Sequence, residues 1–250
     1  MVGTRGLIIK STDGGITWTS LNSGIILPLH GVRYLDLNNA VAVGDSLTIL
    51  KTTDGGTLWR NRRPAGIPGA LLGRKLLSVN FSSSTAGYAV GEGGVYMRST
   101  DGGENWTLQT SFATTSTELR SVYFADQLTG WAVGWSNAPP PGAGIIFRTI
   151  DGGSSWSQLF TGGTTQNLNS VAFQTDGQGI VVGSGGIILK ALNGGAAPSD
   201  WSFQPKGHIN VGVIDGSKRF VVLGLPLHLL DGSGTVKDFL RHVILDEFGP

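Results

Sequence analysis

The chain has 250 residues, of which 40 are glycine, 14% are charged and none is cysteine, and its formal net charge is +1. Much glycine and little charge indicate many short strands joined by turns rather than long solvent-facing helices. A charge near zero excludes a strong overall attraction to nucleic acid, and the lack of cysteine excludes disulfides, thiolate metal sites and a cysteine nucleophile.

No apolar run approaches the roughly 18 residues of a membrane-spanning helix. Met1 is followed by Val-Gly-Thr-Arg-Gly rather than by a basic and then apolar signal region. We therefore expect no transmembrane segment and no signal peptide in this chain. The compartment stays open on this evidence, because a chain without cysteine fits any redox environment.

One turn motif recurs along the chain and sets its organisation. It reads Ser/Thr-x-Asp-Gly-Gly-x-x-Trp, and we call it an Asp box. A fifth copy has asparagine for aspartate and three extra residues before its tryptophan. The boxes are centred on Asp13, Asp54, Asp101, Asp151 and Asn193, and their tryptophans are Trp18, Trp59, Trp106, Trp156 and Trp201.

Two apolar segments precede the later boxes. The first reads Leu-x-Ser-Val-x-Phe and the second ends in glycine, and 15 residues separate the leading leucine from that glycine, as from Leu76 to Gly91. A third short segment, such as residues 145–148, leads into the box, and a fourth begins at the box tryptophan. Each unit of about 42 residues therefore predicts four short strands, which we name A to D.

A four-stranded meander repeated at this spacing is the sequence signature of a β-propeller blade. We predict an all-β propeller over residues 1–224 as a single domain, followed by a tail at residues 225–250. The tail is expected to contain a helix at residues 235–248, because Thr235-x-x-Asp238 is like a capping box and apolar residues follow at helical spacing.

The number of blades depends on how the ring closes. Residues 2–3 read as the end of a strand B, so the preceding strand of that blade comes from elsewhere. We favour five blades, closed by pairing N- and C-terminal strands, with residues 209–224 as strands A and B and the N-terminus as strands C and D. In the six-blade alternative, residues 225–230 form a strand C, Asp231 opens a decayed sixth box, and residues 240–245 form a strand A.

The boxes are expected to be structural turns. An aspartate carboxylate accepts hydrogen bonds from nearby backbone N–H groups, and glycine tolerates a positive φ. The tryptophan opens strand D and buries its ring between blades. One turn per repeat spaces the carboxylates blade by blade around the ring, too far apart for a shared catalytic or calcium site.

These boxes resemble those of the Asp-box (BNR-like) superfamily. The fuller pattern of Ser-Val-x-Phe, Gly-Tyr-Ala-Val-Gly and Ser-Thr-Asp-Gly-Gly-x-x-Trp is most similar to the photosystem II assembly and stability factor-like family, over residues 2 to about 224. The resemblance implies a non-catalytic propeller that lies outside the cytoplasm, in a periplasm or lumen or secreted. It also implies binding of a membrane-protein assembly intermediate through an arginine-rich surface.

Asp boxes also occur in sialidases and in propeller glycoside hydrolases that cleave xyloglucan-type chains. A sialidase-like site needs an arginine triad, a Tyr-Glu pair and an acid aspartate, and the usual Arg-Ile-Pro opening is absent. A glycosidase needs two carboxylates about 5 to 9.5 Å apart. Asp45 and Glu92, which follow strand B in neighbouring repeats, are the weak candidates for that pair.

Functional side chains are expected at the end of the blades that carries the B–C turns and the D–A connections, opposite the boxes. Besides Asp45 and Glu92, this end carries Trp135 in a long B–C loop. No two histidines have metal-ligand spacing, so we expect no metal and no other cofactor. The starts of strand A contribute one equivalent position each, occupied by His30, Arg120, Asn169 and Asn210.

The longest D–A connection, residues 60–75, contains no acid and five cations, namely Arg60, Arg62, Arg63, Arg74 and Lys75. A guanidinium is planar, always charged and bidentate, which suits carboxylates and phosphates. Our leading hypothesis is a non-catalytic interaction module whose basic loop face binds a protein partner rather than nucleic acid. The alternative is a carbohydrate-binding, glycoside-hydrolase-like or sialidase-like propeller that uses Trp135, Asp45 and Glu92.

Overall fold

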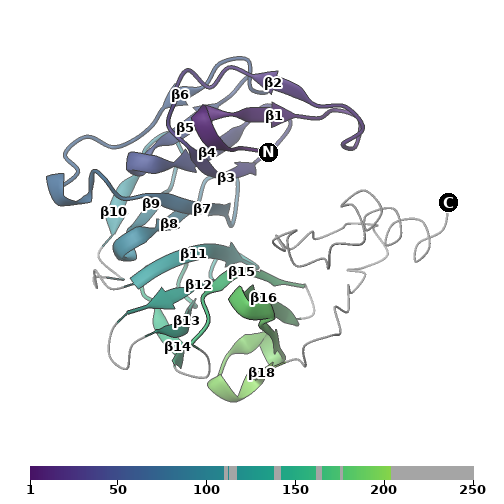
Figure 1. Cartoon of the computed structure of the whole chain (residues 1–250), viewed down its shortest axis with the longest axis vertical. Helices are drawn as coiled ribbons and strands as arrows, with labels where there is room; N and C mark the ends of the chain where they lie inside the picture. Colours follow the sequence, from purple (N-terminus) through teal and green to yellow (C-terminus); the bar gives the residue numbers. More distant parts are fainter. Residues whose placement is uncertain (110–111, 113–116, 138–141, 162–164, 175–176, 204–250) are drawn as a thin grey trace. The chain divides into compact units, whose positions relative to one another are not determined.

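The computed structural model describes residues 1–109, 112, 117–137, 142–161, 165–174 and 177–203 (Figure 1). The described part is built of strands and short 3-10 turns, which form one two-stranded sheet and four four-stranded sheets. Every strand pair is antiparallel, and each four-stranded sheet uses four strands that are consecutive in the chain. The all-β meander predicted from the repeat is thereby confirmed.

We number the sheets one to five along the chain, and strands A to D follow the chain within each four-stranded sheet. Sheet one contains β1 (Ile8–Lys10) and β2 (Thr19–Leu21). Sheet two contains β3 (Leu29–Tyr34), β4 (Ala40–Gly44), β5 (Ile49–Thr52) and β6 (Arg60–Asn61). Sheet three contains β7 (Leu76–Phe81), β8 (Gly87–Gly91), β9 (Tyr96–Ser99) and β10 (Thr107–Gln109). Sheet four contains β11 (Thr117–Phe124), β12 (Gly130–Ser136), β13 (Ala143–Thr149) and β14 (Ser157–Thr161), and sheet five contains β15 (Leu168–Phe173), β16 (Gly179–Gly183), β17 (Ile188–Ala191) and β18 (Trp201–Phe203).

The helical segments of the described part are all single 3-10 turns. Four of them form B–C turns, namely η1 (Thr4–Gly6), η2 (Asp45–Leu47), η4 (Glu92–Gly94) and η5 (Ser184–Gly186). The others are η3 (Gly69–Leu71) in the basic loop and η6 (Asn193–Gly195) and η7 (Pro198–Asp200) around the fifth box. Within the described residues, none of these helices is long and apolar enough to cross a membrane.

Sheet one has a short partial strand B beside β1. Val2 forms a bridge with Ile8, and the Ile9 N–H donates to the Met1 carbonyl at 2.9 Å. Residues 2–3 therefore lie where the end of a strand B was predicted. The closing strands at 209–224, the six-blade alternative at 225–245 and the helix at 235–248 fall outside the described residues and stay predictions.

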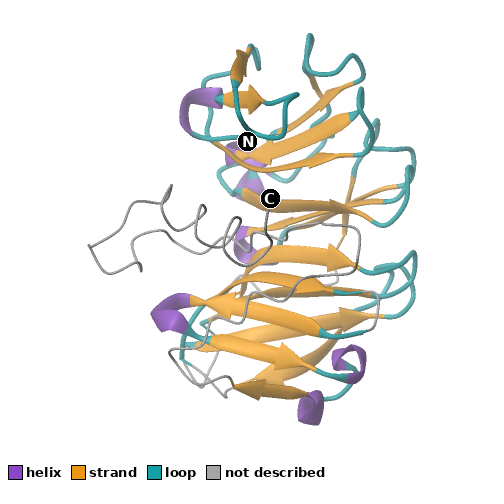
Figure 2. Ribbon diagram, turned by 90° about the vertical axis from the view of Figure 1, so that its right-hand side faces the viewer, coloured by secondary structure: helices purple, strands orange, loops and turns teal. Residues whose placement is uncertain are grey.

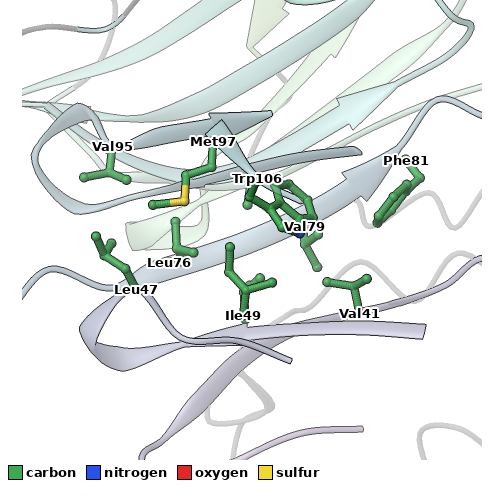
Figure 3. Close-up of a cluster of buried hydrophobic side chains, with 11 residues drawn as sticks. Val41, Leu47, Ile49, Leu76, Val79, Phe81, Val95, Met97 and Trp106 are labelled. Atoms are coloured by element: carbon green, nitrogen blue, oxygen red, sulfur yellow. The ribbon is translucent and has the colours of Figure 1, made fainter. Parts of the chain in front are cut away.

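The core consists of clusters that join one sheet to the next. In the cluster drawn in Figure 3, Val41 and Ile49 of sheet two face Leu76, Met97 and Trp106 of sheet three. All five side chains are at most 3% exposed. Three further clusters repeat the arrangement along the chain, so each sheet buries its apolar face against a neighbour rather than within itself.

The serine of the Leu-x-Ser-Val-x-Phe pattern links strand A of one sheet to strand A of the next. The Val122 N–H donates to the Ser78 hydroxyl at 3.2 Å, and the Val171 N–H donates to the Ser121 hydroxyl at 3.4 Å. A valine N–H of strand A thus finds an acceptor in the neighbouring sheet. The serine of the pattern therefore links neighbouring sheets, in addition to lying in strand A.

The Asp box is a turn closed by its own side chains. In the third box, Ser99 donates its hydroxyl to Asp101 at 2.9 Å and accepts the Gly103 N–H at 2.9 Å. Asp101 also accepts the Asn105 N–H at 2.9 Å. The same set recurs in the first, second and fourth boxes. Because the glycine at the position of Gly103 has a φ of +79° to +99° in these four boxes, a side chain there is disfavoured.

The box tryptophans lie against the preceding sheet. Trp59, Trp106 and Trp201 are 3% to 8% exposed, and Trp156 is half-buried. Trp18 departs from the expected burial, since 47% of it is exposed. No sheet within the described residues covers it, because sheet one has no preceding sheet there.

The glycine that closes the strand B pattern is required because the start of strand A passes too close for a side chain. A Cβ built on Gly44, Gly91, Gly134 or Gly183 would overlap a backbone carbonyl oxygen at the start of strand A of the same sheet. This contact explains why the strand B pattern ends in glycine in the four four-stranded sheets. It also holds the B–C turn directly against the D–A connection.

We predict that Gly91→Ala lowers the free energy of unfolding by about 2 kcal/mol, because the methyl group forces strands A and B apart. The measurement is urea unfolding followed by tryptophan fluorescence. Gly73→Ala is the matched control, since a Cβ at Gly73 meets nothing within 4 Å. Equal midpoints for the two variants would contradict the proposed overlap.

For the box, we predict that Asp101→Ala lowers the free energy of unfolding by about 1 to 2 kcal/mol, because three hydrogen bonds to its carboxylate are lost. Asp101→Asn should cost less, because an amide oxygen still accepts the Asn105 N–H and asparagine occupies this position in the fifth box. Thermal unfolding of the two variants measures the difference. An unchanged melting temperature for Asp101→Ala would refute the structural role.

The boxes also predict an acid sensitivity. The hydroxyl and N–H of Ser155 lower the pKa of Asp151 from 3.8 to about 2. Since the folded pKa lies below the unfolded one, the unfolded chain binds more protons, and this contribution is lost as the pH falls from about 4 to 2. Asp151→Asn should therefore flatten the fall in urea midpoint over this range, and a slope identical to that of the parent protein would contradict the assignment.

Candidate functional site

The strands present two different ends. At one end, which we call the loop end, each B–C turn is bonded to the start of strand A: the Asp45 N–H donates to the Pro28 carbonyl and the Glu92 N–H to the Lys75 carbonyl, at 2.9 and 3.0 Å. At the other, the box end, the Gly102 N–H of a box donates to the Thr85 carbonyl of the A–B turn at 2.8 Å. In Figure 2 the 3-10 B–C turns lie at the opposite strand ends from the loops of the boxes.

Strand A carries a β-bulge in all four four-stranded sheets, directly after the leucine that starts the Leu-x-Ser-Val-x-Phe pattern or its equivalent. A bulge leaves one residue unpaired and re-aims its side chain, and bulges of this kind are common beside functional sites. The bulged residues are His30, Leu77, Arg120 and Asn169. Three of them are the strand A residues that the sequence marked as one equivalent position, while Asn210 lies outside the described residues.

In sheet two, the bulge brings His30 onto the B–C turn. Its Nε2 lies 2.6 Å from Oδ1 of Asp45, and both side chains are partly exposed at 31% and 25%. The carboxylate predicted as a weak catalytic candidate is therefore held by the imidazole of its own sheet. The pair adds a polar group to the loop end beside the basic loop.

The cations of the basic loop, residues 60–75, differ in their contacts: some are paired with carboxylates and others are not. Arg62 pairs with Glu104 of sheet three at 2.7 Å, and Lys51 pairs with the other oxygen of Glu104 at 2.7 Å. The hydrogen bond from Lys51 and the charges of both cations hold the pKa of Glu104 below its usual range, although burial opposes them. Arg62 is thus turned away from the loop end, and it shares the single negative charge of Glu104 with Lys51.

Lys75 is also paired within the protein. Its Nζ lies 3.3 Å from Oε1 of Glu92, and its backbone N–H donates to Oε2 at 3.2 Å. Glu92, the second weak catalytic candidate, is therefore bound to the side chain and backbone of Lys75, just before strand A. Asp45 and Glu92 each have a cationic or imidazole partner in their own sheet.

Three arginines of the basic loop have no carboxylate partner among the described residues, namely Arg60, Arg63 and Arg74. Arg63 donates from Nη1 to the Ser46 carbonyl at 3.2 Å. The guanidinium of Arg74 lies over the B–C turn of sheet three, where a Cβ on Gly93 would come within 2.5 Å of its Nη1. Arg63 and Arg74 are thus held at the B–C turns of adjacent sheets.

The turn under Arg63 is unusual for its sequence. Ser46 and Leu47 both have a φ of 54°, whereas glycines occupy the two matching positions of sheet three. The left-handed region costs a side-chain-bearing residue roughly 1 to 2 kcal/mol. Full burial of Leu47 and its bond from N–H to the Arg74 carbonyl at 3.0 Å hold the turn in place. The strained backbone of Ser46 and Leu47 therefore lies where Arg63 and Arg74 of the basic loop are bonded.

Arg120 and Trp135 extend the loop end to sheet four. Nε of Arg120 lies 2.8 Å from Oε1 of Glu118, and its Nη1 donates to Oδ1 of Asn169 in sheet five at 2.9 Å. Trp135 is half-buried and pairs with Glu118 across strands β11 and β12. Arg120 therefore joins two sheets and is partly neutralised.

The sequence did not identify the two acids that form ion pairs with cations of the predicted site, Glu104 and Glu118. Glu118 had a local signal, because it stands two residues before Arg120 at the start of a strand. Glu104 had none, since it is 42 residues from Arg62 and meets it only through sheet packing. Within the described residues, no three His, Asp or Glu side chains are grouped so as to hold a metal ion.

Comparisons with known proteins agree with this architecture. A sequence model described as photosynthesis system II assembly factor YCF48 matches residues 26–108 and 72–161, which together cover more than half of the chain. The photosystem II assembly lipoprotein Ycf48 of Synechococcus sp. (strain CC9902) is 28% identical over 228 residues, and the alignment covers 85% of this chain. The chain spans 62% of the length of that curated relative.

Solved structures support the fold. YCF48 from Cyanidioschyzon merolae matches with a TM-score of 0.55 and 24% identity over 70% of this chain and 55% of its own. The GH74 xyloglucanase from Xanthomonas campestris matches with a TM-score of 0.60 and 12% identity over 80% of this chain and 34% of its own. Both likenesses bear on the fold alone, and the fold is that of a β-propeller. On the match to the family model, the chain belongs to the photosynthesis system II assembly factor YCF48 family.

Proposed function

We propose that this chain is a non-catalytic assembly factor that binds an anionic segment of a protein partner at its loop end. Membership of an assembly-factor family supports a binding role, and so does the relative named a photosystem II assembly lipoprotein. The observation that carries the proposal is the pair Arg63 and Arg74. Each is held at a B–C turn, and neither has a carboxylate partner among the described residues.

The basic loop is held in place before a partner binds. Ile67 and Leu71 pack on the cluster between sheets two and three, and Arg62 and Lys75 fix the two sides of the loop through Glu104 and Glu92. Ordering a loop on binding costs free energy, so an ordered loop binds more tightly for the same contacts. The paired cations thus act as anchors, and the unpaired ones are left for a partner.

The chemistry of the free guanidiniums points to carboxylates. Each presents a planar fork of N–H donors that fits a carboxylate in a bidentate manner. Arg60, on the exposed strand β6, extends the charge toward the outer strand of sheet two. We therefore propose an acidic peptide segment as the ligand class, lying across the B–C turns of sheets two and three.

The carbohydrate alternative has less support. The GH74 likeness is at 12% identity and bears on the fold, and Asp45 and Glu92 are each engaged by a neighbouring side chain. We also propose a place outside the cytoplasm, supported by the family and by a relative named a lipoprotein. We further propose that residues 1–224 form a single domain and that residues 225–250 form a tail.

We predict that Arg63→Ser with Arg74→Ser weakens binding to acidic peptides about tenfold or more and reduces its dependence on salt, because two charge-assisted contacts are removed. The measurement is fluorescence anisotropy with labelled peptides that cover the photosystem II subunits, and with a poly-glutamate peptide as the charge-only probe. Arg62→Ser is the matched control, since Arg62 is an anchor paired with Glu104: its loss should weaken binding less than the double variant does and leave the dependence on salt unchanged.

Two results would overturn the proposal. Peptide binding that is equal in the parent protein and the double variant, or equal at low and high salt, would exclude the basic loop as the site. Turnover in a glycoside substrate panel that Glu92→Gln abolishes would show that the protein is an enzyme. Thermal unfolding of each variant checks that any loss of binding is not a loss of folding.

A further inference from the structure

Both B–C turns that hold the basic loop open with a carboxylate. Asp45 is the first residue of η2 in sheet two, and Glu92 is the first residue of η4 in sheet three. The other two 3-10 B–C turns of the described residues open with Thr4 and Ser184, which carry no charge. An acidic peptide that lies across the turns of sheets two and three therefore meets two negative charges, unless cations of the protein offset them.

The two carboxylates have partners of different kinds. Nζ of Lys75 lies 3.3 Å from Oε1 of Glu92, and lysine stays charged throughout the range near neutral pH. Nε2 of His30 lies 2.6 Å from Oδ1 of Asp45, and an imidazole changes its charge between about pH 5 and 8. The net charge of the Glu92 pair is thus constant over this range, whereas the net charge of the Asp45 pair depends on pH.

The contact between His30 and Asp45 suits both charge states of the imidazole. Nε2 carries a proton in the imidazolium and in one neutral tautomer, and in either form it donates to the carboxylate. Loss of the second ring proton therefore changes the net charge of the pair from zero to minus one and leaves the hydrogen bond in place. Because both side chains are partly exposed, this change of charge acts on a ligand that lies at the turn.

The turn that carries Asp45 also contacts both arginines of the proposed site. The next residue, Ser46, accepts a hydrogen bond from Nη1 of Arg63 at 3.2 Å through its carbonyl. The residue after that, Leu47, donates its N–H to the Arg74 carbonyl at 3.0 Å. Three consecutive residues of one turn thus contact the titratable histidine and the two arginines. A change in net charge at Asp45 is therefore a change beside the groups that we propose bind the ligand.

The other charged side chains on the elements around this pair keep their charge near neutral pH. Arg5 lies on η1, which packs against strand β3, and the two arginines come from the basic loop. The Lys75–Glu92 pair lies at the neighbouring turn of sheet three. Arginine and lysine titrate well above pH 8 and ordinary carboxylates well below pH 6. Among the side chains that the structure describes here, the histidine is therefore the one whose charge changes between about pH 6 and 8.

We propose that His30 regulates the basic loop site through Asp45, so that acidic peptides bind more tightly as the pH falls. A neutral imidazole leaves the negative charge of Asp45 beside the ligand, and an imidazolium offsets that charge. Since the protonated pair repels an anionic ligand less, peptide binding favours protonation, and by linkage protonation favours peptide binding. The inference rests on the proposed function and adds to it a residue that acts through the turn rather than on the ligand.

The test is fluorescence anisotropy of a rhodamine-labelled poly-aspartate peptide with the full chain at pH 6 and pH 8, at constant ionic strength. The carboxylates of this probe stay ionised at both pH values. We expect the parent protein to bind about threefold or more tightly at pH 6, the size of effect that one nearby surface charge gives. His30→Gln should bind at both pH values as the parent does at pH 8. His30→Lys should bind at both as the parent does at pH 6, because it makes the sheet two pair like the Glu92 pair.

Glu92→Gln is the matched control, because it removes the carboxylate whose partner does not titrate, and it should keep the ratio of affinities of the parent. Any ratio left in His30→Gln comes from other groups, such as the Met1 amine, whose pKa burial lowers, and the three histidines of residues 204–250. The difference between the parent and His30→Gln therefore isolates the contribution of His30.

Equal affinity ratios in the parent and in His30→Gln would overturn the inference, and so would a ratio in His30→Lys equal to that of the parent. Either result leaves the proposed function standing if Arg63→Ser with Arg74→Ser still abolishes the binding. Binding that survives in this double variant at both pH values would instead contradict the proposed function. Thermal unfolding at each pH checks every variant, and His30→Lys supplies the test if His30→Gln fails to fold, since both remove the titrating group.

Discussion

The packing of each Asp-box tryptophan on the preceding sheet is the contact on which the other features depend. A sheet of short strands buries little area by itself, and its apolar face needs a neighbour. Trp106 covers Val41 and Ile49 in this way, and the cluster joins two sheets into one core. The tryptophan is placed by a turn whose side-chain hydrogen bonds join residues at most four apart, so a polar motif sets the apolar packing between sheets.

This arrangement gives the two ends of the strands different roles. At the box end, the aspartates of the first four boxes use their carboxylates to close their own turns. At the loop end, the strand B glycines bring each B–C turn against the D–A connection, and the bulges aim one side chain per sheet at the same region. The D–A connections at this end vary in length without disturbing the core. For this reason one of them, residues 60–75, can be long and basic.

The basic loop shows what local sequence cannot decide about a site. Its five cations look equivalent along the chain, but Glu104 pairs with Arg62 and Glu92 pairs with Lys75, while Arg63 and Arg74 lie on backbone turns. Glu104 belongs to a box one repeat away and meets Arg62 only because sheets two and three stack. The pairing of His30 with Asp45 was likewise hidden, since a bulge had to re-aim the histidine.

The sequence by itself determined the repeat, the four strands of each unit, the box turns and the family, because spacing, turn chemistry and apolar alternation are properties of contiguous residues. The choice of glycine at the end of strand B was visible as a pattern, although its cause, a carbonyl oxygen in the way of a Cβ, was not. Only the tertiary structure decided which cations stay free, which tryptophan stays exposed and which carboxylates are engaged. Those outcomes depend on contacts between sheets about 42 residues apart, where burial and charge pairing are set by neighbours that the local sequence does not contain.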